Sequence, residues 1–195
     1  MTAINLASDS CLNADVLESQ RLDCLHAVFR RLFEVAENTS LCGGADEPLY
    51  EPASTPLEKH CIYYTRNYLS SALHEIAHWC IAGAQRRAQR DYGYWYAPDG
   101  RDAEQQSRFE QVEVAPQAVE WHLALACGHR FRVSADNLES GFAPSALFCE
   151  RIVEQARLYS QLGLPERALR LASELHRLSG LPLPRVEDFT LGVLR

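Results

Sequence analysis

The sequence lacks the patterns that would place a protein in a membrane or on an export route. No run approaches the roughly 20 apolar residues that a membrane-spanning helix requires. The N-terminal stretch MTAINLASDS has neither a basic segment nor a long apolar one, so we expect no signal peptide. These absences predict a cytoplasmic protein that has no membrane partner.

Paired cysteine motifs are also missing. The chain has 7 cysteines, an odd number, and none of them form a CxxC pair. This spacing gives no support to a structural zinc site of four cysteines or to a disulfide framework. Several of the cysteines lie in apolar stretches such as HCIYY and HWCIA. We therefore expect buried thiols in the reduced state that is normal in the cytoplasm.

Basic residues are fewer than acidic ones. The chain has 19 Lys and Arg against 26 Asp and Glu, which gives a net charge of −7. Nonspecific binding of nucleic acid depends on basic surfaces, so no direct nucleic-acid partner is expected. The acidic balance suits a cationic partner or substrate, and it serves solubility equally well.

Length and hydrophobic periodicity predict an α+β fold that is mainly α, in a single domain spanning residues 1–195. The patterns predict helices at about 15–35, 67–89, 116–126, 144–162 and 165–179. Asn67 is the expected cap of the second helix. A short β-rich run at 60–65 predicts a strand, and the proline-rich residues 45–59 predict a loop.

The segment HEIAH, at residues 74–78, has the spacing of a metal site. On a helix, His74 and His78 lie one turn apart on the same face, where both imidazoles can bind one divalent metal ion. Glu75 lies about 100° further round the helix and can flank the ion without binding it. The small residues Ala72 and Ala77 leave space for an ion. The alternative is a pair of histidines packed in the core.

Two histidines do not complete a metal site, and no third histidine follows at the spacing of the extended zinc-peptidase patterns. A carboxylate from elsewhere is the expected third ligand, and the candidates are Glu113, Glu110 and Glu120. Glu113 is favoured because it lies between two valines just before the helix predicted from Pro116, and a carboxylate in an apolar setting needs a compensating partner. A charge interaction at that helix's N-terminus is the alternative.

The segment DYGYWYAPDGRD, at residues 91–102, is rich in aromatic and turn-forming residues. Aromatic rings can line a pocket for an aliphatic cation, and carboxylates can pair with its charge. We expect Tyr94, Tyr96, Asp99 and Asp102 to contact the substrate. The alternative is an aromatic flap over the core, with the aspartates shaping a turn.

Several of these runs together resemble the elongation factor P hydroxylases of gammaproteobacteria. The likeness is strong from about residue 46 to 137 and includes DEPLYEPA, SALHEIAHWCIAG, VSADNLES and the long run DYGYWYAPDGRDAEQQSRFEQVEVAPQAVEW. It implies hydroxylation of the modified lysine of elongation factor P after a β-lysyl group has been attached. It also implies a zincin-like helix pair with His74, His78 and Glu113 as a 2-His-1-carboxylate set, and Glu75 as a catalytic residue near the metal that is not a ligand. The metal-site core would then span about 46–137, followed by C-terminal helices at about 144–180.

The implied chemistry limits which metal ion can serve as the cofactor. Two histidines and one carboxylate leave coordination positions open, as in non-haem Fe(II) oxygenases that bind dioxygen. Zinc has no redox chemistry, so Fe(II) is the expected metal and dioxygen the expected cosubstrate. No iron–sulfur, flavin or dinucleotide motif indicates an electron donor. Two other functions fit the motif: a zincin-type metallopeptidase, in which Glu75 activates water, and a non-catalytic module stabilised by the metal.

Overall fold

Helices form most of the computed structural model, which describes residues 6–93, 102–134 and 144–194. The helices are α1 (Leu6–Phe29), α2 (Leu69–Ile81), α3 (Ala84–Arg87), α4 (Ala103–Ala126), α5 (Ala146–Leu162) and α6 (Glu166–Ser179). A short π-helix is η1 (Arg30–Glu34), and short 3-10 helices are η2 (Arg90–Gly93) and η3 (Val186–Asp188). The strands are β1 (Thr39–Ala45), β2 (Leu49–Glu51) and β3 (His60–Thr65). The predicted class, α+β and mainly α in one domain, is confirmed. The zincin-like character of the helix pair stays a prediction.

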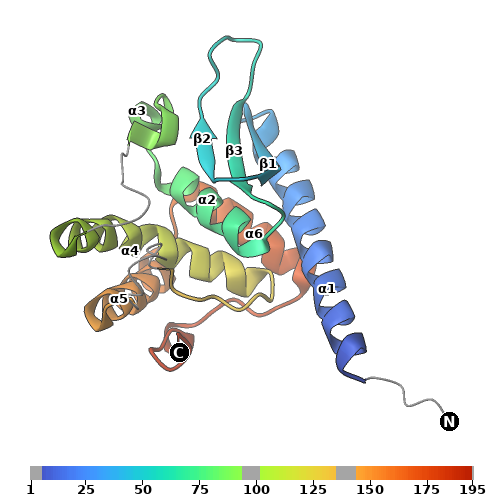
Figure 1. The fold of residues 1–195 in the computed structure, drawn as a ribbon, viewed down its shortest axis with the longest axis vertical. Coiled ribbons are helices and arrows are strands. Elements are labelled where there is room, and N and C mark those ends of the chain that lie inside the picture. The colour runs from blue at the N-terminus through green and yellow to red at the C-terminus, as the bar shows by residue number, and fades with distance from the viewer. Residues whose placement is uncertain (1–5, 94–101, 135–143, 195) are drawn as a thin grey trace.

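The three strands form one sheet in the order β1-β3-β2 (Figure 1). The central strand β3, predicted from its aromatic and β-branched residues, pairs parallel with β1 and antiparallel with β2. The first predicted helix ends close to the expected residue 35, and β1 follows it as a strand that was not predicted. The strand β2 lies within residues 45–59, where only a loop was expected, so that expectation was wrong in part. The pairing of β1 with β3 shifts register between Cys42 and Ala45, where Gly44 has a φ of +81°. A Cβ at Gly43 would lie 2.5 Å from the Tyr64 hydroxyl, so this strand needs glycine there.

Helix α2 lies beneath the sheet and contacts β3, α4 and α6 (Figure 1). Its predicted apolar stripe is confirmed, because Ala72, Leu73, Ile76 and Ala77 are fully buried. The helix begins after Tyr68, with no side-chain cap from Asn67, and it ends at Ile81, earlier than expected.

The carbonyl groups at the end of α2 are satisfied by an arginine of α6. The Arg167 guanidinium donates hydrogen bonds to the backbone carbonyls of Trp79, Cys80 and Ala82, at 2.9, 3.1 and 2.6 Å. The last carbonyls of a helix need such donors when the helix does not continue. The pattern that predicted one long helix therefore covers α2 and the separate short helix α3.

Helix α4 starts 13 residues before the start expected at Pro116 (116 − 103). Asp102 caps it: the Asp102 carboxylate accepts from Gln105 N at 2.8 Å, and the Gln105 side chain accepts from Asp102 N at 3.0 Å. Pro116 lies inside the helix, where we expected it near the first turn. Glu110 and Glu113 consequently lie on the helix instead of before it.

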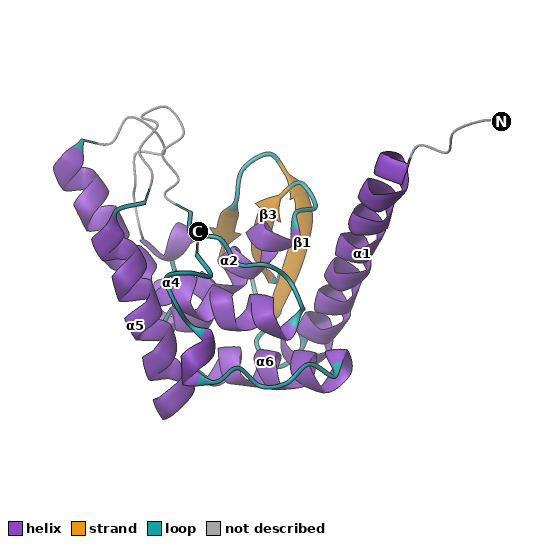
Figure 2. Ribbon diagram, turned by 90° about the horizontal axis from the view of Figure 1, so that it is seen from below, coloured by secondary structure: helices purple, strands orange, loops and turns teal. Residues whose placement is uncertain are grey.

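Helices α5 and α6 confirm the two predicted C-terminal helices, with Ser145 capping α5. Figure 2 shows α1 and α5 on opposite sides of the helices between them. One continuous core joins the parts, and Trp121 of α4 packs edge-on against Phe189 of the C-terminal segment.

None of the described helices has the length and apolar content to cross a membrane. The described cysteines have free thiols, but only Cys80 of them is buried, so the expectation of buried thiols was largely wrong.

Candidate metal centre

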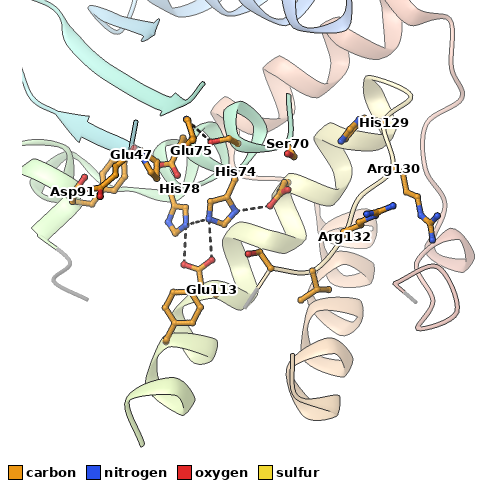
Figure 3. A pocket seen from close by; sticks show the side chains of 18 of the residues that line it. Glu47, Ser70, His74, Glu75, His78, Asp91, Glu113, His129, Arg130 and Arg132 are labelled. Atoms are coloured by element: carbon orange, nitrogen blue, oxygen red, sulfur yellow. Dashed lines mark hydrogen bonds and ion pairs between the residues drawn. The ribbon is translucent and has the colours of Figure 1, made fainter. Parts of the chain in front are cut away.

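Two helices bring His74, His78 and Glu113 together. Helix α2 presents the two imidazoles one turn apart, and α4 places the Glu113 carboxylate opposite them (Figure 3). The two Nε2 atoms lie 3.1 Å apart. Glu113 Oε1 is 3.2 Å from His78 Nε2, and Glu113 Oε2 is 3.5 Å from His74 Nε2. Within the part of the chain that the structure describes, these three residues form a group able to hold a metal ion.

The separations of these ligand atoms suit a single ion. Atoms bound to one metal at about 2.1 Å, with angles of roughly 90–110° between them, lie about 3.0–3.4 Å from each other. Two of the three separations, 3.1 and 3.2 Å, lie in that range, and the third, 3.5 Å, is just above it. Neutral imidazole nitrogens and a carboxylate are also the donor types that Fe(II) and Zn²⁺ accept. The residues present therefore fit a divalent transition-metal ion.

Two further buried residues of α4, Glu120 and Gln117, form hydrogen bonds to the candidate ligands. Glu120 Oε2 lies 2.8 Å from His74 Nδ1, the ring nitrogen on the far side from Glu113. The Gln117 amide donates to Glu113 Oε2 at 3.4 Å and to the Ser134 carbonyl at 2.8 Å, and its oxygen accepts from Ser134 N at 3.2 Å. Sequence reasoning named Glu120 only as a possible ligand and did not identify Gln117. The spacing of 113, 117 and 120, one face of a helix, was the signal that could have found both.

The carboxylates around the histidines shift the pKa values of the group. Burial opposes charge on His74, but the hydrogen bond to Glu120 and the charges of Glu120 and Glu113 outweigh it and raise the His74 pKa well above 6.5. Burial also opposes charge on Glu113, yet the charges of His78 and His74 and hydrogen bonds from His78 and Gln117 lower the Glu113 pKa to about 2. The centre therefore stabilises positive charge opposite Glu113.

Glu75 lies beside both histidines without belonging to the ligand group. It lines the same cavity as His74 and His78. Burial raises the Glu75 pKa, and the two neighbouring imidazoles partly oppose that shift. This is the flanking position that the helical spacing predicted.

A cavity of about 1040 Å³ opens onto the three candidate ligands. The carboxylates of Glu47, just before β2, and Asp91, in η2, lie on one side of this cavity (Figure 3). The basic residues Arg130 and Arg132 line the opposite side. Tyr92 also lines the cavity; its ring stacks on Tyr50 at 4.4 Å between centroids. Glu47 and Asp91 thus lie on the other side of the candidate ligands from Arg130 and Arg132, although Glu18 also lines the cavity near His129.

The remaining predicted residues lie elsewhere. Glu110 accepts hydrogen bonds from Ser145 Oγ at 2.7 Å and Ser145 N at 3.3 Å, so its carboxylate serves the start of α5 and is not in the ligand group. Asp102 is exposed and caps α4. Tyr94, Tyr96 and Asp99 lie outside the described residues. Contact of the four 94–102 residues with the substrate stays a prediction.

Comparisons with known proteins agree with the resemblance noted from the sequence. Residues 28–189 match the family described as elongation factor P hydroxylase. A protein of Haemophilus influenzae described as elongation factor P lysine hydroxylase is 48% identical over 155 residues, which cover 80% of this chain and 87% of that protein. The chain belongs to the elongation factor P hydroxylase family.

Proposed function

We propose that this protein hydroxylates the β-lysylated lysine side chain of elongation factor P, as a monooxygenase that depends on one Fe(II) ion and uses dioxygen as cosubstrate. The relative from Haemophilus influenzae, described as an elongation factor P lysine hydroxylase, supports the reaction and the substrate. The observation that carries the metal dependence is the convergence of His74, His78 and Glu113 on the cavity.

In this proposal His74, His78 and Glu113 hold the ion from the side formed by α2 and α4. Bound there, Fe(II) supplies the redox chemistry with dioxygen that insertion of oxygen into a C–H bond requires. One oxygen atom enters the product and the other is reduced to water, which takes two electrons from an external donor. All three residues line the cavity, so the coordination positions they leave open face the space that a substrate would enter.

The cavity suits a long cationic side chain. Its volume is at the upper end of ordinary ligand pockets, about 300–1000 Å³, which leaves room for a modified lysine and part of its carrier loop. In the proposal, Glu47 and Asp91 pair with ammonium groups, and the Tyr92 ring lies along the aliphatic part. Further contacts come from the segment that follows, at Tyr94, Tyr96, Asp99 and Asp102.

The direct test is intact mass spectrometry of β-lysylated elongation factor P before and after incubation with the protein, Fe(II), air and a reductant such as ascorbate. We expect a gain of one oxygen mass on the modified lysine, with none in the His74→Ala variant. An unchanged mass with the metal-loaded wild-type protein would contradict the proposal. The unmodified factor, run in parallel, reports whether the β-lysyl group is needed.

A hydrolase is the second candidate, and the position of Glu75 favours it. A glutamate next to two metal-binding histidines acts as the general base in zinc peptidases, and Glu75 lines the cavity beside both. Cleavage of a peptide by the zinc-loaded protein, lost in Glu75→Gln, would support this candidate. The same incubation without any cleavage would count against it.

A further inference from the structure

We propose that Glu120 is a positioning residue that fixes the ring of His74, so that this histidine binds the metal through Nε2. The inference rests on the proposed metal centre and adds to it the residue that orients one of its ligands. It starts from the 2.8 Å contact between Glu120 Oε2 and His74 Nδ1.

The direction of this hydrogen bond follows from the chemistry of its partners. An ionised carboxylate offers only acceptors, so the shared hydrogen belongs to His74 Nδ1, which donates it. Once its proton has left, the other ring nitrogen, Nε2, presents its lone pair to the side where His78 Nε2 and Glu113 lie, at 3.1 and 3.5 Å. A carboxylate or carbonyl on the second ring nitrogen is the usual way in which a metal-binding histidine is held.

The location of Glu120 favours this role over a surface ion pair. Its side chain is 9% exposed, and α4 packs against α2. Seven residues, close to two helical turns, separate Glu113 from Glu120. One face of α4 therefore presents a candidate ligand to the Nε2 edge of His74 and an acceptor to its Nδ1 edge.

A buried carboxylate could instead serve folding alone, by pairing with whatever cation lies nearby. The two roles predict different effects of a Glu120 substitution on metal binding. An acceptor that only stabilises the fold changes the melting temperature, whereas a positioning residue also changes metal affinity and the ring nitrogen that binds the ion. Removal of such partners typically weakens metal binding by about 10- to 100-fold.

The test compares Glu120→Ala, Glu120→Gln and the matched control Glu110→Gln, which removes a carboxylate from the same helix outside the ligand group. Calorimetric titration with Co²⁺ measures affinity, and melting curves measure stability. Two-bond proton–nitrogen spectra of the Zn²⁺-loaded wild-type protein identify the His74 nitrogen that binds the metal. We expect metal on Nε2, a dissociation constant about 10- to 100-fold higher in Glu120→Ala, a smaller rise in Glu120→Gln, whose amide oxygen still accepts, and no change in Glu110→Gln.

Wild-type Co²⁺ affinity in folded Glu120→Ala would overturn the proposal, and so would metal on His74 Nδ1. If Glu120→Ala does not fold, the Co²⁺ affinity of Glu120→Gln and the His74 nitrogen identified in the wild-type spectra still test the proposal. A wild-type protein that binds neither Co²⁺ nor Zn²⁺ would instead contradict the proposed metal centre itself, so the two failures are distinguishable.

Discussion

Replacement of Glu113 by glutamine keeps the shape of the side chain and removes its charge, which makes it a sharp perturbation of the centre. In the metal-free protein, His78 and His74 lower the Glu113 pKa from 4.5 to about 2. At 1.36 kcal/mol for each pH unit, the carboxylate gains about 3 kcal/mol from its surroundings. Because the folded-state pKa is the lower one, this stabilisation is present above pH 4.5 and is lost as the pH falls toward 2.

Glu113→Gln should therefore lower the stability of the metal-free protein at neutral pH by at most about 3 kcal/mol. It should also weaken divalent metal binding by more than the roughly 100-fold typical of residues that only support a ligand. Urea denaturation of the metal-free protein and Co²⁺ titration measure the two effects. Glu110→Gln is the control, because that carboxylate bonds to Ser145 and should leave both quantities near wild type. Loss of metal from Glu110→Gln, with metal retained by Glu113→Gln, would refute the assignment.

Four further predictions concern the candidate ligands, the residue beside them and the expected substrate contact at Asp102. His74→Ala and His78→Ala should each abolish tight metal binding while circular dichroism shows that most of the fold is kept; unchanged metal content by elemental analysis would contradict this. Glu75→Gln should keep its metal and lose only part of its hydroxylation rate, and complete loss together with peptidase turnover in the wild type would favour the hydrolase. Asp102→Asn should weaken affinity for the lysylated factor by roughly 1–3 kcal/mol without lowering the melting temperature, because asparagine caps helices as well as aspartate does; wild-type affinity would leave Asp102 as a cap only. Metal affinity should fall as pH falls, by up to tenfold for each pH unit, because the raised His74 pKa means that a proton must leave before the ion binds; a pH-independent Co²⁺ affinity from pH 6 to 8 would contradict that reasoning.

The sequence predicted the helix that carries the histidines because two signals agreed there. The apolar stripe of α2 and the HEIAH spacing both require a helix, and the structure has one at Leu69–Ile81. The preference for Glu113 over Glu110 also agrees with the geometry, although the reason given was incomplete. Glu113 lies inside α4, seven residues before Glu120 on the same face, and not in front of a helix that starts at Pro116.

The errors had two causes, a local capping signal that was overlooked and tertiary contacts that no local pattern shows. Pro116 normally marks a first helical turn, but the capping box of Asp102 and Gln105 starts α4 earlier, and the same residues read as a turn in sequence. The carbonyls at the end of α2 are bonded by Arg167, which is 86 residues beyond Ile81 (167 − 81), so no local pattern could show this partner. The role of Gln117 depends on a partner in another segment, Ser134, and was equally invisible.

The most direct measurement of the proposed activity uses isotopically heavy dioxygen. Wild-type protein loaded with Fe(II) is incubated with β-lysylated elongation factor P, a reductant and labelled dioxygen in ordinary water, and the modified peptide is analysed by mass spectrometry. A monooxygenase that uses the centre formed by His74, His78 and Glu113 should place one heavy oxygen atom on the modified lysine, and metal-free protein should place none. A product oxygen that comes from water, or an unmodified peptide after full metal loading, would contradict the account.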